Sequence, residues 1–127
     1  MASPFILITA HRVQDGQLPA LEELGRAFVE SIDANEPNAL DFELYLSEDG
    51  TQLTHVLIER DAEAMERHFQ ISGELIGKSL ALAETTDITV LGQPGPILSD
   101  VLAKNAAQGV RVQVQPRQMN GLVRAPA

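Results

Sequence analysis

Three histidines, His11, His55 and His68, are the side chains whose ordinary pKa lies near neutrality, so they are the first candidates for acid–base chemistry. None of them is paired at a local metal-ligand spacing such as His-x-His, and a metal site would need contacts between distant parts of the chain. We therefore expect no bound metal. His11 and Thr9 are two positions apart in one predicted strand, so their side chains are expected on the same face. His11 and His55 are each expected to be half-buried structural residues or to face an uncovered side of a sheet, and His68 to lie at solvent or an interface.

Carboxylates are numerous, but general acid–base work requires a carboxyl group in an apolar pocket that raises its pKa. Glu59 is the best candidate because it follows His55 and Leu57 at the alternating spacing of one strand face. The alternative is an ion pair between Glu59 and a neighbouring base at the strand end.

The composition excludes several classes of function. The 127 residues contain no cysteine, which rules out disulfides, thiolate catalysis and iron–sulfur clusters, and they suffice for one domain. A net charge of −9 opposes binding to nucleic acid or to an anionic membrane. The longest apolar run, residues 5–10, is far below a membrane span, and we expect a cytoplasmic protein.

Hydrophobic periodicity predicts the elements that must position these side chains. Alternating or β-branched stretches predict strands, and apolar residues spaced three or four apart predict helices. The expected order is a strand over 5–13, a helix over 17–32, strands over 40–47 and 51–60, a helical region over 61–83 with a break near Gly73, a strand over 86–91, a helix ending near Ala107 and a strand over 110–115.

This order predicts an α+β protein with the ferredoxin-like split βαβ arrangement, an antiparallel sheet with helices on one face. The other face then needs a partner or a ligand. Residues 1–92 would form this domain, and 93–127 a C-terminal helix–strand extension with a mobile tail rather than a second domain. The last strand could join its own sheet or the partner's. The basic charge of the extension against an acidic body favours the partner or the dimer seam.

Several short motifs carry a resemblance to a known family. The stretch from Glu36 to Asp49 resembles the Glu-Pro-Gly-Cys-Leu-x-Tyr-Glu-Leu-x-x-Ser-x-Asp signature of antibiotic biosynthesis monooxygenase domains. Residues 57–60 match the family's third-strand Glu, residues 64–68 its Glu-Ala-Leu-x-x-His helix, and residues 13–17 its first turn. The resemblance covers roughly residues 5–92.

The resemblance implies a dimeric α+β barrel, in which the sheets of a homodimer close face to face. Members include cofactor-independent oxygenases that act on anthrones and quinols, and haem-degrading enzymes. Haem degradation is not expected here, because Thr9 stands where that branch has Asn and no histidine follows His68. The Trp that usually follows the strand-three Glu-Arg is also missing, since Asp61 comes directly after Arg60.

We therefore expect a homodimer that binds an aromatic, quinol-like molecule in the barrel interior and oxidises it without metal, flavin or other cofactor. His55 or His11 would be the catalytic base. Candidate substrate contacts are Thr9, Tyr45, Glu59 and His68. The rival hypothesis is a non-catalytic ligand-binding or assembly module of the same fold, which the missing Trp favours.

Overall fold

The computed structural model describes residues 3–124 and confirms the expected α+β fold. None of the helices in this part of the chain is long and apolar enough to cross a membrane. The elements follow the predicted order: β1 (Phe5–Val13), α1 (Leu18–Asn35), β2 (Ala39–Leu46), β3 (Gln52–Glu59), α2 (Ala62–Ile71), α3 (Gly73–Leu80), β4 (Ala83–Leu91), α4 (Pro96–Ala107) and β5 (Arg111–Gln115).

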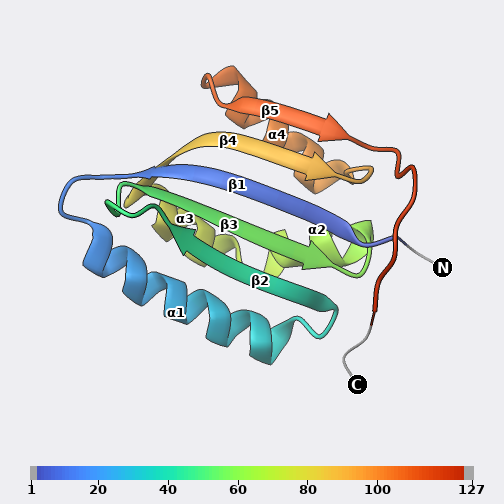
Figure 1. The fold of residues 1–127 in the computed structure, drawn as a ribbon, viewed down its shortest axis with the longest axis horizontal. Helices are drawn as coiled ribbons and strands as arrows, with labels where there is room; N and C mark the ends of the chain where they lie inside the picture. Colours follow the sequence, from blue (N-terminus) through green and yellow to red (C-terminus); the bar gives the residue numbers. More distant parts are fainter. Residues whose placement is uncertain (1–2, 125–127) are drawn as a thin grey trace.

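The strands form one mixed sheet in the order β2-β3-β1-β4-β5, with β1 at its centre (Figure 1). β1 pairs antiparallel with both β3 and β4, and Thr9 lies opposite His55 on one side and Ile88 on the other. β2 pairs antiparallel with β3, and β5 runs parallel to β4. The register thus brings two residues that the sequence singled out, Thr9 and His55, side by side in the middle of the sheet.

One face of the sheet carries the hydrophobic core. Leu7 of β1, Leu57 of β3 and Val90 of β4 are buried there. Met65 of α2 and Leu98 of α4 pack against them. Figure 1 shows α2, α3 and α4 behind the strands and α1 beside β2. Each of these side chains contributes roughly 1.5–3 kcal/mol by leaving water, so this layer holds helices and sheet together.

The opposite face of the sheet is apolar along its two middle strands. Ile6 and Ile8 of β1 lie opposite Ile58 and Val56 of β3, and their parity is opposite to that of the core leucines. All four are half-buried within the single chain. This face has the character of a surface that a second layer could cover.

Most helix and strand ends lie within one residue of the prediction, and the larger differences are at the end of α1, the end of α3 and the start of β4. α1 continues to Asn35 and stops because Glu36, with φ −125° and ψ 76°, precedes Pro37. The region predicted as one broken helix is α2 and α3, which meet at Ser72, next to the expected break. β4 begins at Ala83, three residues before the predicted start, because Ala83 is buried opposite β1.

The C-terminal extension docks on its own subunit. β5 adds to the β4 edge of the same chain, with Val112 opposite Ile88, so the expectation that it would join the partner's sheet is wrong. The reason is that α4 crosses over and returns the chain to the neighbouring edge. The Glu66 carboxylate on α2 accepts the backbone N–H groups of Ile97 (2.7 Å) and Leu98 (2.8 Å), which fixes the first turn of α4.

Candidate functional site

A cavity of about 1060 Å³ lies between the sheet and the helices. Phe28 of α1 and Phe42 of β2 form part of its wall, with ring centroids 6.1 Å apart. Gly25 allows α1 to lie close to β2 here, since a Cβ atom at this position would lie only 3.0 Å from Leu44 Cδ1. A concave, largely apolar space with a few polar groups is the usual form of a small-molecule site.

Two of the predicted residues, His11 and His55, form a pair on the sheet wall of this cavity. His11 Nε2 and His55 Nδ1 lie 3.4 Å apart, so one ring nitrogen donates to the other, and Thr85 Oγ1 lies 3.2 Å from His11 Nδ1. Burial lowers the pKa of His11 to about 4. Burial, and then the charges of His11 and His68, lower the pKa of His55 to about 3. Both rings are therefore neutral at physiological pH. In the tautomer in which His55 Nδ1–H donates to His11 Nε2, His55 Nε2 is left to accept a hydrogen bond.

The histidine pair faces the helices and not the open side of the sheet. Thr9, His11 and His55 all line the cavity, so the expectation that the histidines could face the uncovered side is wrong. The cavity lies between sheet and helices of one chain, whereas the sequence suggested a pocket enclosed by two sheets. Tyr45 lies opposite Thr54, is 66% exposed and does not line the cavity. It is therefore not part of this candidate site.

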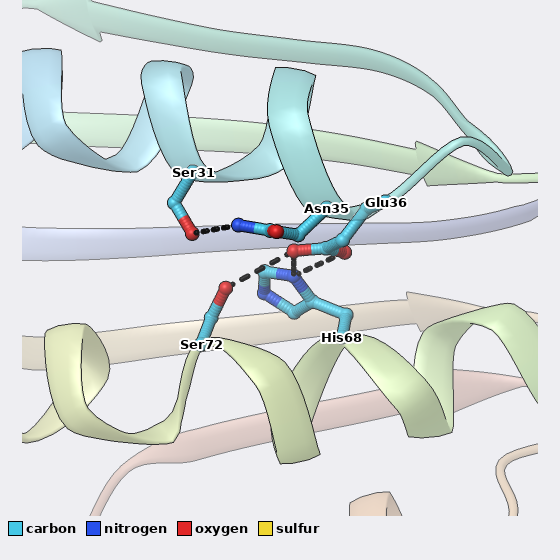
Figure 2. Close-up of polar contacts among 5 residues, drawn as sticks. All are labelled: Ser31, Asn35, Glu36, His68 and Ser72. Carbon is cyan, nitrogen blue, oxygen red and sulfur yellow. Dashed lines mark hydrogen bonds and ion pairs between the residues drawn. The ribbon is translucent and has the colours of Figure 1, made fainter.

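A second polar group lies deeper, where α1 ends against α2. Figure 2 shows His68 and Ser72 pointing at the Glu36 carboxylate. His68 Nδ1–H donates to Glu36 Oε1 (2.9 Å) and Oε2 (3.0 Å), and the Ser72 hydroxyl donates to Oε2 (3.1 Å). Burial alone would raise the pKa of Glu36, but the hydrogen bond and charge of His68 outweigh it and lower that pKa. The prediction of a solvent or interface position for His68 is wrong, because its side chain is buried.

Glu59 lies beside Glu36. Its surroundings raise its pKa, as expected for the acid–base candidate, and do not provide the alternative ion pair. It is 1% exposed, and its Oε2 atom has no hydrogen-bond partner among the described residues. Burial, and then the charge of Glu36, raise its pKa to about 8. The ion pair with a neighbouring base is absent from residues 3–124. A carboxyl group with these surroundings is protonated at neutral pH and can donate to Glu36.

Glu36, Glu59 and His68 could each offer one ligand atom to a cation, and these atoms lie within 4.8 Å of one another. The tertiary contacts that the sequence could not supply thus bring together one histidine and two carboxylates. The same two carboxylates line a smaller pocket of about 260 Å³, whereas His68 lines the large cavity.

Sequence reasoning missed three members of these clusters: Glu36, Ser72 and Thr85. Glu36 stands in the first position of the family signature, and that position was the one available signal. Ser72 lies between two helices and Thr85 in an alternating polar stretch, and neither position carries a chemical signal of its own.

Comparisons with known proteins agree with this architecture. The family model described as antibiotic biosynthesis monooxygenase matches residues 4–72. No curated protein matches the chain in sequence.

Solved structures resemble the chain to different extents. MupZ from Pseudomonas fluorescens has a TM-score of 0.71 at 19% identity, over 95% of this chain and 91% of MupZ. PA3566 from Pseudomonas aeruginosa has a TM-score of 0.61 at 25% identity, over 75% of this chain and 98% of its own. SnoaB, a cofactor-independent oxygenase from Streptomyces nogalater, has a TM-score of 0.62 at 14% identity, over 74% and 96% of the two chains. MupZ therefore shares the C-terminal part of the fold as well.

Proposed function

Because the chain belongs to the antibiotic biosynthesis monooxygenase family, we propose that it binds an aromatic, quinol-like small molecule in the large cavity and oxidises it without metal or flavin. The observation that carries the proposal is the neutral His11–His55 pair on the wall of a cavity large enough for a fused-ring ligand. SnoaB, of the same fold, is a cofactor-independent oxygenase, which supports the reaction class.

In this proposal the protein removes a hydroxyl proton from the ligand. His55 accepts the hydrogen bond of the hydroxyl, with His11 holding the ring from behind, and either histidine serves as the base. The resulting anion is electron-rich and reduces dioxygen directly. One oxygen atom enters the ligand, so that an anthrone CH₂ becomes C=O, and the other leaves as water with the two hydrogens of that CH₂. The hydroxyl proton returns from the histidine to the ligand oxygen. Thr9, buried opposite His55, adds a hydroxyl near the ligand.

Oxygen uptake across a panel of anthrones and hydroquinones tests the proposal. We expect uptake with at least one fused-ring member, and a loss of most of it in His55→Ala. Thr54→Ala serves as a matched control, because Thr54 is the neighbour of His55 on the opposite strand face. Uptake no higher than that of His55→Ala across the whole panel would remove the enzyme function.

A second candidate function is a non-catalytic ligand-binding or assembly module. It is favoured by the absence of the Trp that follows the third-strand Glu-Arg in the family pattern, since Asp61 takes that place and caps α2 by accepting from Ala64 N–H. Ligand binding in calorimetry without oxygen uptake would be the result that selects this function.

We further propose that the protein is a homodimer in which the open sheet faces meet. Ile6, Ile8, Val56 and Ile58 form the apolar centre of that face. Ile8→Lys should give a monomer in sedimentation, because a charge would be buried there without a partner. Val29→Lys, on an exposed position of α1, is the control and should leave the dimer intact. A wild-type protein that sediments as a folded monomer at micromolar concentration would overturn this part.

A further inference from the structure

The sheet wall of the large cavity offers a ligand hydrogen bonds without a positive charge. The polar side chains on that wall are Thr9, His11, His55 and Thr85, and all of them are buried or half-buried. Burial lowers the pKa of His11 to about 4 and that of His55 to about 3, so both rings are uncharged at neutral pH. A ligand hydroxyl can therefore be bound here, whereas a ligand carboxylate meets no cation.

The third histidine that lines the cavity already donates to an anion. His68 Nδ1–H donates to Glu36 Oε1 at 2.9 Å, and both side chains are buried (Figure 2). The Glu36 carboxylate thus lies directly behind this part of the wall. A ligand carboxylate brought next to His68 would be repelled by Glu36 in surroundings that screen charge poorly.

The charged side chains of the cavity lining stand at its rim, where they are exposed. In residues 3–124 they are Glu22, Arg26 and Glu30 of α1, Glu84 of β4 and Lys104 of α4. Both bases are paired with acids outside the lining. Arg26 Nη2 donates to Glu23 Oε2 (2.8 Å), and Lys104 Nζ lies 3.0 Å from Asp100 Oδ2. The positive charges of the rim are therefore already compensated.

Two acids of the rim are not compensated in the same way. Glu22 and Glu30 lie one helical turn before and after Arg26, and neither forms an ion pair with a described residue. The net charge of −9 adds repulsion at longer range. An anion that stayed at the mouth would thus lie beside acids rather than bases.

We propose, building on the proposed ligand class, that the cavity selects neutral aromatic ligands and rejects those that carry a carboxylate. A carboxylate placed on the inner wall loses its hydration and gains no charged partner. A carboxylate left at the mouth lies beside Glu22 and Glu30. A neutral hydroxyl avoids both penalties, and its proton, once passed to a histidine, stays beside the ligand anion, so the contents of the cavity remain neutral as a whole.

Two anthraquinones of nearly equal size test this selection without turnover. Aloe-emodin has a hydroxymethyl group where rhein has a carboxylate, and the two phenolic hydroxyls are the same in both. Equilibrium dialysis at pH 7 and low ionic strength should give a dissociation constant for rhein at least about tenfold above that for aloe-emodin. Danthron, which has a hydrogen at the same ring position, should bind about as tightly as aloe-emodin.

A base added at the rim should admit the anion. Leu80, at the end of α3, lines the cavity and is 55% exposed, so Leu80→Arg places a positive charge there without entering the core. It should tighten rhein about two- to fivefold, the range of exposed ion pairs, and change aloe-emodin by less than about twofold. Met119→Arg makes the same change in net charge at an exposed residue outside the lining, and should leave both constants unchanged.

Removing the rim acids is the second, independent perturbation. The double variant Glu22→Gln and Glu30→Gln should also tighten rhein about two- to fivefold and leave aloe-emodin unchanged, and high salt should remove the difference. Both positions are exposed on α1, so the variant keeps the fold.

The outcomes separate this proposal from the proposed function. If none of the anthraquinones binds to the wild type, the ligand class is wrong and the charge selection goes with it. If aloe-emodin binds and rhein binds equally well or more tightly, only the charge selection is overturned. Equal gains for rhein in Leu80→Arg and Met119→Arg, or no gain in the Glu22 and Glu30 double variant, would overturn the part assigned to the rim.

Discussion

Buried titratable groups should make the free energy of unfolding depend on pH in two opposite directions. The folded-state pKa values of His11 and His55 are about 4 and about 3, against 6.5 in the unfolded chain. Below pH 6.5 the unfolded chain binds protons that the folded chain does not, so both histidines lower stability as pH falls. Glu59 has a folded-state pKa of about 8 against 4.5, so the folded chain binds its proton first and stability rises as pH falls from 8 to 4.5.

The magnitudes follow from about 1.4 kcal/mol for each pKa unit. Between pH 6.5 and 4.5 the two histidines together remove about 4 kcal/mol and Glu59 adds about 2 kcal/mol, a net loss of about 2 kcal/mol. Between pH 8 and 6.5 the contribution of Glu59 is the larger, and stability rises by about 1 kcal/mol. The wild type should therefore be most stable near pH 6.5.

Single substitutions should separate the two contributions. Glu59→Gln removes the acid's contribution, so the maximum should disappear and the loss between pH 6.5 and 4.5 should grow to about 4 kcal/mol. His55→Gln removes one histidine, and the remaining His11 should nearly balance Glu59, which gives a flat profile over the same range. Glu63→Gln, at an exposed position of α2, should reproduce the wild-type curve.

Urea unfolding followed by far-ultraviolet circular dichroism measures these profiles, because the chain has no Trp and a single Tyr to serve as a fluorescent probe. The protein concentration must stay fixed, since self-association would add to the stability. Parallel curves for the wild type and Glu59→Gln from pH 8 to 4.5 would refute the assignment of a folded-state proton to Glu59.

Three further predictions concern packing and the extension. Met65→Ala, at a fully buried position, should lower the free energy of unfolding by about 2–5 kcal/mol in urea titrations, and an effect below 1 kcal/mol would contradict its place in the core. Glu66→Ala should lower the free energy of unfolding by about 1–2 kcal/mol, because the first turn of α4 loses the acceptor of two N–H groups. Glu63→Ala, the control, should change it little. Equal effects of the two substitutions would show that the Glu66 carboxylate does not stabilise α4. Truncation after Leu91 should lower the melting temperature because it uncovers the core beneath α4, and an unchanged melting temperature would show that the extension is not part of the folded unit.

The fold was predictable where one periodicity dominates a segment. β2 and β3 alternate strictly, and α1 repeats its apolar residues at helical spacing, so all three elements were placed within a few residues. The start of β4 was missed because Ala83-Glu84-Thr85 lacks an apolar run and is fixed only by pairing with β1. The sequence could not predict which β4 edge β5 would pair with, because the unpaired backbone of β4 offers the same donors and acceptors in either subunit.

The site was predictable in some of its members, but Tyr45 lies outside it, and the surroundings of the members were not predictable. His11, His55, Thr9, Glu59 and His68 do gather around the cavity and the buried cluster. The orientation of the histidines was open because β1 is apolar on both faces, and alternation cannot say which face the helices cover. The burial of His68 depends on an acid 32 residues away along the chain, and only the folded structure shows that contact.

The central place of β1 has a consequence for the synthesis of the protein. Residues 5–13 are synthesised before either strand that pairs with them, since β3 begins at residue 52 and β4 at residue 83. Until β3 has emerged, this nine-residue strand has no partner on either edge, and one edge stays open until β4 follows. Long-range pairing of this kind is slow. Such a segment can pair with the same segment of a neighbouring nascent chain. Repulsion between chains that carry a net charge of −9 opposes that encounter.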